Sequence, residues 1–184
     1  RMAAAAFEGD ELVIKHTAAR IVITPEDRSD FSVEIDNPGR APMPIVSIVN
    51  GDVRIDGQLG GRLEACREGG GVNLDGYGEL TLADLPQIVI RAPRNLQLSL
   101  GGAGATEIGE TALLDLDVMG CGGVTAGDVT GALGVEITGT AAVAAGAARS
   151  LTVDLLGSGS LTAGAIAEGA EVETTGSGSA TIAS

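Results

Sequence analysis

The stretch VDLLGSGSLTAG, residues 153–164, decides the fold of this chain. It places alternating glycines and serines between two short apolar runs, and related versions of it occur four more times. The five copies begin 18 or 19 residues apart, at positions 98, 116, 135, 153 and 172. A fixed period near 20 residues is typical of a solenoid, in which each repeat stacks on the next.

Each copy opens with alternating apolar and polar residues, as in Leu116, Asp117 and Val118. This period of two predicts a β-strand with one buried face. A glycine follows each strand, at positions 102, 120, 139, 157 and 176, where a tight corner favours a residue without a side chain. A second strand and a third short apolar segment complete the copy. We therefore expect an all-β chain without major helices, built as a parallel β-helix with coils of 18–19 residues.

Residues 1–95 contain short alternating strands without a fixed spacing. We expect them to form less regular coils with protruding turns, so that residues 1–184 make a single β-helix domain whose regular part is 96–184. The segment VNGDV at 49–53 leaves two interpretations open. Asn-Gly is typical of a tight hairpin, but the segment also fits another coil corner, which is the interpretation we favour.

The charge of the chain is strongly negative, with 25 Asp and Glu against 11 Lys and Arg, a net charge of −14. Such a surface repels phosphate groups, so the composition argues against nucleic-acid binding and against attachment to anionic lipid surfaces. No run reaches the roughly 18 apolar residues of a membrane span. We interpret most of this charge as a solvated surface that keeps the protein soluble.

The two cysteines are Cys66 and Cys121, which lie 55 residues apart, close to three repeat periods. If the period extends back to Cys66, the two occupy similar corners about 14 Å apart. A disulfide requires Cα atoms within about 7 Å, so we expect two free, largely buried thiols. The first residues, RMAAAAFEGDE, are consistent with the remainder of a secretory cleavage site or with a simple boundary.

The segment VDLLGSGSLTAGAIAEGAEVETTGSGSATI, residues 153–182, resembles the bacterial auto-transporter adhesin head family, the GIN domain. LVIKHTAARIVITPEDRSDFSVEI, residues 12–35, is similar to the opening strands of the same family. The resemblance covers most of the chain. It implies a right-handed parallel β-helix, exported to the periplasm or cell surface, without a defined enzymatic activity. Cys121 and Thr140 replace the usual corner serine and Ala141 replaces a glycine, which concerns packing rather than function.

Four acidic residues recur at the same place in the repeat, directly after its first apolar position: Asp117, Glu136, Asp154 and Glu173, with Ser99 in the first copy. In stacked coils they would form an outward row with a spacing of about 4.8 Å. We interpret this row as a charged face that prevents lateral pairing with other chains. The alternative is a weak site for calcium or another hard cation, which prefers carboxylate oxygens. The corners themselves contain no Asp, so the calcium mechanism of nonapeptide repeats does not apply.

Residues typical of catalytic sites are few. His16 is the single histidine and lacks partners for a metal site or a triad, so we expect an exposed residue at a strand end. Tyr77 and Phe31 fit the end or corner of a core better than a ligand platform. A carbohydrate-processing enzyme would need a groove in which several acids converge beside Arg62, Arg67 or Arg91. We assign no catalytic, cofactor-binding or metal-binding residue and no cofactor.

The sequence is thus most consistent with a non-catalytic, exported bacterial envelope or cell-surface protein, an adhesin-like interaction module for an unknown protein or glycan. The first alternative is a periplasmic scaffold that self-associates through its end coils, since exposed strand edges can pair between chains. The second is a carbohydrate-processing β-helix enzyme, which the single base in residues 96–184, Arg149, argues against.

Overall fold

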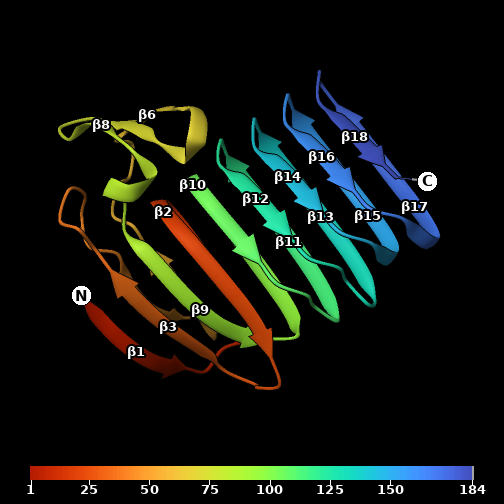
Figure 1. Cartoon of the computed structure of the whole chain (residues 1–184), viewed down its shortest axis with the longest axis horizontal. Helices are drawn as coiled ribbons and strands as arrows, with labels where there is room; N and C mark the ends of the chain where they lie inside the picture. The colour runs from red at the N-terminus through yellow and green to blue at the C-terminus, as the bar shows by residue number, and fades with distance from the viewer. Residues whose placement is uncertain (184) are drawn as a thin grey trace.

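The computed structural model describes residues 1–183 and confirms an all-β chain (Figure 1). Fifteen strands form one large mixed sheet, and three more form a small antiparallel sheet beside it. In this part of the chain the helical structure is limited to two short 3₁₀ turns, η1 (Glu68–Gly70) and η2 (Leu82–Asp84).

The regular half of the chain forms two parallel ladders that follow the sequence repeat. The strands of the first ladder are β10 (Asn95–Ile108), β11 (Leu113–Gly120), β13 (Ala132–Gly139), β15 (Ala148–Gly157) and β17 (Ile166–Thr175). The pairings Leu98 with Leu116, Leu116 with Val135 and Val135 with Val153 carry the 18- or 19-residue offset from strand to strand. The stacking of consecutive repeats is therefore confirmed.

The second ladder begins after the corner glycines, with β12 (Gly123–Ala126), β14 (Ala142–Ala145), β16 (Ser160–Ala163) and β18 (Ser179–Ile182). The last part of β10 completes it by pairing with β12. The expected third segment of each repeat has no strand of its own: Thr111 and Val129 form a single bridge, and residues 166–170 belong to the start of β17.

The core lies between the two ladders, and every second side chain along each strand points into it. Leu98, Leu116, Val135 and Val153 are all buried, and Leu161 faces them from the second ladder. Medium-sized aliphatic side chains suffice because each repeat is narrow and is covered by the repeats on either side. Alternation along the strands thus predicted the buried face correctly.

The first half of the chain differs from the expected coils. β2 (Leu12–Glu26) pairs in parallel with β10, and β9 (Gln87–Pro93) pairs in parallel with β2. The sheet then continues with two antiparallel strands, β3 (Phe31–Asp36) and β1 (Met2–Phe7). Residues 1–95 therefore do not form a series of parallel coils, and the sheet is mixed and open rather than a closed parallel structure.

The segment at 49–53 is a hairpin, and our preference for a coil corner was wrong. β4 (Ile45–Val49) and β5 (Asp52–Asp56) are antiparallel, and Asn50 and Gly51 at the turn have φ of 52° and 79°. Asn-Gly adopts these positive values at little cost, which matches the twist of two adjacent strands. β5 also pairs in parallel with β2, so the hairpin extends the main sheet.

Residues 57–85, here called the insertion, form the small sheet of β6 (Leu63–Cys66), β7 (Val72–Leu74) and β8 (Gly78–Leu80). Its own small core contains the buried Leu59, Val72, Leu74, Leu80 and Leu85. Figure 1 shows this sheet at the upper left of the molecule, beside β2 and β10. No feature of the repeat predicted it, because its strands carry no copy of the periodic pattern.

Candidate functional site

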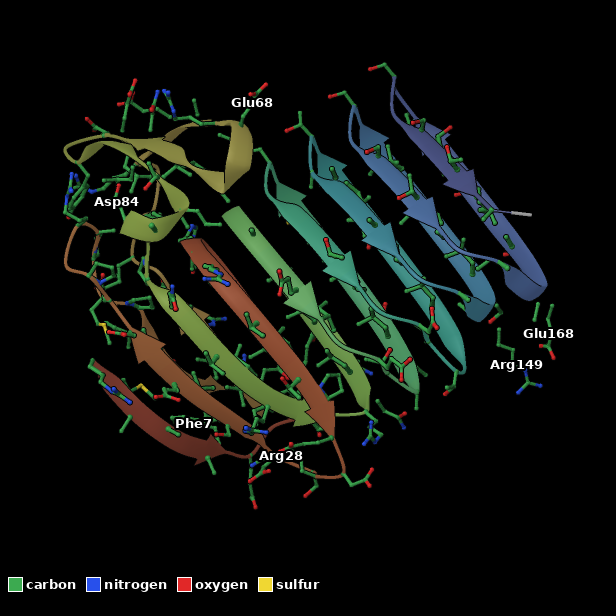
Figure 2. All side chains as sticks on the ribbon, viewed as in Figure 1. Phe7, Arg28, Glu68, Asp84, Arg149 and Glu168 are labelled. Carbon is green, nitrogen blue, oxygen red and sulfur yellow. A yellow bond between two sulfur atoms is a disulfide. The ribbon has the colours of Figure 1, made fainter. Side chains whose placement is uncertain are left out.

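The acidic row predicted from the repeat is present. Asp117 pairs with Glu136, Glu136 with Asp154, and Asp154 with Glu173, in one line across β11, β13, β15 and β17. The last three of these side chains are exposed, and Asp117 is partly buried. Arg149 does not balance them, since it forms its ion pair with Glu168, 2.9 Å away, at the ends of the strands (Figure 2).

Further acids widen this row into a negatively charged face. The pKa of Glu136 is raised above its usual value, first by the charge of Asp117 and then by burial. Burial raises the pKa of Asp117, with a further contribution from Asp115. The pKa of Glu11, directly before β2, is also raised, by burial and then by Asp52. In each case the folded protein disfavours the ionised form of the carboxyl group.

This acidic face does not form a metal centre. Across residues 1–183, no group of three or more His, Cys, Asp or Glu side chains is arranged to hold a metal ion. The carboxylates stand side by side along the ladder instead of converging on one point. The carboxylates thus form a negatively charged row on one side of the sheet.

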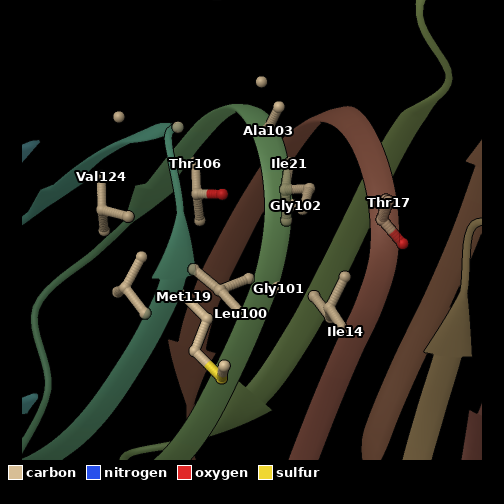
Figure 3. A pocket seen from close by; sticks show the side chains of 14 residues that line it. Ile14, Thr17, Ile21, Leu100, Gly101, Gly102, Ala103, Thr106, Met119 and Val124 are labelled. Atoms are coloured by element: carbon tan, nitrogen blue, oxygen red, sulfur yellow. The ribbon is translucent and has the colours of Figure 1, made fainter. Parts of the chain in front are cut away.

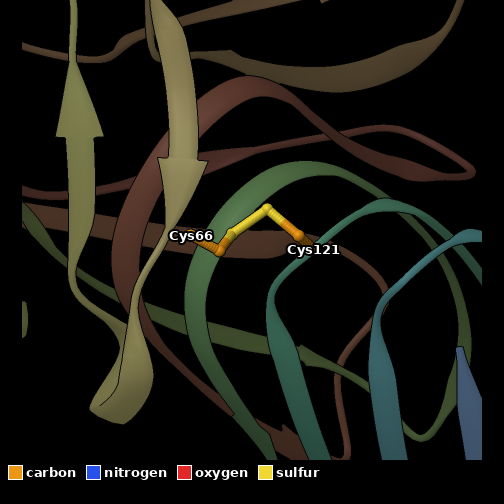
Figure 4. Close-up of a disulfide and its surroundings, with 2 residues drawn as sticks. All are labelled: Cys66 and Cys121. Carbon is orange, nitrogen blue, oxygen red and sulfur yellow. A yellow bond between two sulfur atoms is a disulfide. The ribbon is translucent and has the colours of Figure 1, made fainter.

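The two cysteines form a disulfide, and our prediction of free thiols was wrong (Figure 4). The Cα atoms of Cys66 and Cys121 are 6.0 Å apart. Cys66 ends β6 in the insertion instead of occupying a repeat corner, so the count of coil periods does not apply to it. Cys121 directly follows the corner Gly120. The bond therefore fastens the insertion to the corner between β11 and β12.

Beside this bond, the insertion and the corners of β2, β10 and β11 enclose a groove of about 490 Å³, here called the corner groove. Its apolar lining includes Leu59 and Leu63 from the insertion and Leu100 and Met119 from the sheet. Met119 is 55% exposed although it is a large apolar side chain. The volume lies within the range of about 300–1,000 Å³ that is typical of small-molecule sites.

The only ionisable side chains that line the groove are Lys15 and His16, which are the single lysine and the single histidine of the chain. They lie at a bulge of β2, where the register against β10 shifts between Leu100 and Gly102. His16 has φ of 50°, which is uncommon for a residue other than glycine. His16 is exposed as expected, but it lies within β2 and not at a strand end.

The backbone of the bulge is held by the insertion. Gly57 N–H donates to Lys15 O at 3.0 Å, and Leu59 N–H donates to His16 O at 3.1 Å. A Cβ at Gly57 would lie 2.5 Å from His16 O, so this close approach requires glycine. Bulges re-aim side chains and are frequent next to binding sites. The sequence contains no glycine at the bulge itself that would have indicated it.

A small cavity of about 20 Å³ adjoins the groove inside the sheet corner and shares Ile14, Leu100 and Met119 with it. Figure 3 shows these side chains on three neighbouring strands, with Gly101 and Gly102 between them. The cavity has room for about one water molecule or methyl group. Because Gly101 and Gly102 have no side chains, the groove is deeper at this point.

The arginines considered for catalysis have local partners. Arg91 pairs with Glu26 at 3.0 Å and Arg67 with Glu79 at 2.9 Å, while the Arg62 guanidinium lies 5.9 Å from the centre of the Tyr77 ring. Tyr77 is 40% exposed, so it does not fill a core as expected, whereas Phe31 is buried in the main core. None of these three arginines lines the corner groove.

Comparison with known proteins yields distant structural neighbours. A candidate adhesin from Bacteroides fragilis is 14% identical with a TM-score of 0.46, covering 99% of this chain and 97% of that one. A candidate cell adhesion protein from Clostridium sporogenes is 10% identical with a TM-score of 0.43, covering 99% and 98%. A candidate adhesin from Parabacteroides distasonis is 10% identical with a TM-score of 0.33, covering 99% and 97%. At these values the neighbours say nothing of what this chain binds.

No protein-family model matches the chain, and no curated protein matches it. The resemblance to the GIN domain therefore stays a prediction. Within residues 1–183, no helix is long and apolar enough to cross a membrane.

Proposed function

We propose that this chain is a non-catalytic, exported bacterial protein of the adhesin-like type, which presents a rigid surface to a protein or glycan partner. The observation that carries the export part is the Cys66–Cys121 disulfide. Disulfides persist in oxidising compartments such as the periplasm and the cell surface, and are rare in the cytosol. The bond also holds the insertion in a fixed position above the sheet, which suits a preformed recognition surface.

The architecture supports a binding role over a catalytic one. We propose that residues 96–184 belong to a right-handed parallel β-helix of the GIN type and that residues 1–184 make one domain. Parallel pairing of β2 with β10 joins the two halves through their backbones. The arginines that a lyase or hydrolase would use are engaged in exposed ion pairs or aromatic contacts.

The test is antibody labelling of native cells before and after permeabilisation, combined with alkylation of free thiols before lysis. We expect labelling of intact cells and no alkylation of Cys66 or Cys121 unless a reductant is added. Labelling only after permeabilisation would place the protein in the periplasm and remove the adhesin role. Alkylated cysteines in a cytosolic fraction would contradict export itself.

A second candidate function is a scaffold that associates through the last repeat. β17 pairs with β15 on one side only, and Val172 near its middle is 43% exposed. Unpaired backbone groups on such an edge can accept a strand from a second chain. Sedimentation velocity over a hundredfold range of concentration tests this role. A single species throughout, alongside labelling of intact cells, would leave the surface module as the function.

A further inference from the structure

We propose that the corner groove binds a single-chain amphiphile with an anionic head group, such as a long-chain carboxylate. The apolar chain would lie against Leu59, Leu63 and Met119, and the head group would lie at Lys15 and His16. This inference goes beyond the surface role proposed above and does not depend on it.

The lining of the groove favours an apolar ligand chain. Leu59 and Leu63 line it from the core of the insertion, Leu100 lines it from the main core, and the exposed Met119 lines it from β11. The exposed Met119 side chain adds apolar surface to the groove that the chain of such a ligand would cover. Between these side chains the lining contains Gly101 and Gly102, which place no side chains in the groove.

The charge of the groove is opposite to that of the whole molecule. In a chain of net charge −14, the lining holds Lys15 and His16 and no carboxylate. Neither residue takes part in any ion pair formed within residues 1–183. Asp56 on β5 is the register partner of Lys15, and Asp117 on β11 is the register partner of Ser99, so both carboxylates adjoin the groove although neither lines it. Polar selectivity at one end of an apolar site is the usual pattern for amphiphile recognition.

The groove is preformed, because covalent and hydrogen bonds hold its two sides together. The disulfide fixes the insertion on one side, and the two hydrogen bonds to Lys15 O and His16 O fix it on the other. The positive φ of His16 is a strained conformation of the kind that is stored where a side chain must be aimed. A preformed site loses little conformational entropy on binding, which favours a measurable affinity for a small ligand.

Isothermal titration calorimetry with dodecanoate, kept below its micelle-forming concentration at pH 7 and low salt, tests the proposal. We expect one dodecanoate per chain. Lys15→Gln should raise the dissociation constant about tenfold, because it removes a charge-assisted contact. Gly101→Met should abolish binding because its side chain would fill the groove. The fold should tolerate this substitution, because a Cβ at position 101 meets only ordinary contacts of 3.7 Å or more.

Two matched variants separate the groove from general effects. Arg20→Gln removes one positive charge from an exposed site on the same strand, outside the groove. Thr138→Met places a methionine on β13, two strands from Gly101 in the same register row and also outside the groove. Both should bind dodecanoate like the unmodified chain. His16→Asn tests the second head-group contact, because asparagine tolerates positive φ.

Analogues with the same chain and other head groups complete the test. Dodecan-1-ol should bind about tenfold more weakly than dodecanoate and should not respond to Lys15→Gln. Tighter binding of dodecyltrimethylammonium would overturn the proposal, because it would point to the acidic face. Absence of dodecanoate binding, or equal binding by Gly101→Met, would also overturn it and leave the groove to a protein segment.

Discussion

Gly139 ends β13 with φ of 110°, and a Cβ there would lie 2.7 Å from Gly120 O in the repeat below. Both the backbone conformation and the close stacking therefore exclude a larger residue. We expect Gly139→Ala to lower the free energy of unfolding by about 1–3 kcal/mol. Urea denaturation followed by circular dichroism measures this change.

Gly123 is the matched control for that substitution. It begins β12, has no positive φ, and a Cβ there would meet no atom within 4 Å. Gly123→Ala should change the free energy of unfolding by less than about 0.5 kcal/mol or raise it slightly. Equal losses in both variants would show that the corner geometry is not what constrains Gly139.

For individual residues, the sequence predicted the corner glycines well and residues outside the repeat, such as His16 and Cys66, poorly. All five predicted corner glycines have positive φ, because period and residue type both pointed to the same conformation. His16 and Cys66 carried no such double signal. The conformation of His16 depends on hydrogen bonds from Gly57 and Leu59, far along the chain, and Cys66 depends on an insertion outside the repeat.

Across β11, β13 and β15, the acidic row makes stability depend on pH. The raised pKa of Glu136 means that the folded state binds its proton more tightly than the unfolded state does. Ionised Glu136 therefore destabilises the fold at pH 7, and this loss is relieved as pH falls through the raised pKa. We expect Glu136→Gln to raise the free energy of unfolding at pH 7 by less than about 1 kcal/mol, since the residue is exposed and screened.

The advantage of Glu136→Gln should vanish below the ordinary glutamate value of 4.5 and shrink in high salt. Glu107→Gln is the control, because its register neighbours Val22 and Thr125 are uncharged. Thermal melts of both variants at several pH values provide the comparison. A pH-independent difference, or the same gain in Glu107→Gln, would contradict repulsion along the row.

The elements in residues 96–184 were predictable because every repeat supplies the same strand, corner and strand. In residues 1–95 the same alternation was present but could not tell parallel from antiparallel pairing. β3 and β9 alternate like β11, yet β3 returns antiparallel beside β9. The neighbour of a strand and the direction of their pairing depend on the rest of the sheet. Alternation within one strand does not contain that information.

For the whole molecule, the disulfide links segments 55 residues apart and joins the insertion to the main sheet. Replacing both cysteines by serine should lower the free energy of unfolding by about 2–4 kcal/mol. Hydrogen exchange should rise mainly in the insertion, which has only its small core to hold it, while β13 to β16 keep their protection. A uniform rise throughout the chain would mean that the insertion and the sheet unfold as one unit.

Protection in the intact protein should fall along the stack of repeats. β10 is paired on both sides by β2 and β11, whereas β17 is paired by β15 alone and is exposed along almost its whole length. In a linear stack each repeat is stabilised by its neighbours, so the last one opens most often. We therefore expect peptides from β17 and β18 to exchange fastest and those from β10 and β11 slowest, as measured by mass spectrometry at low protein concentration. Slower exchange in β17 at high concentration would instead show that its free edge pairs with a second chain, which is the behaviour that the scaffold role requires.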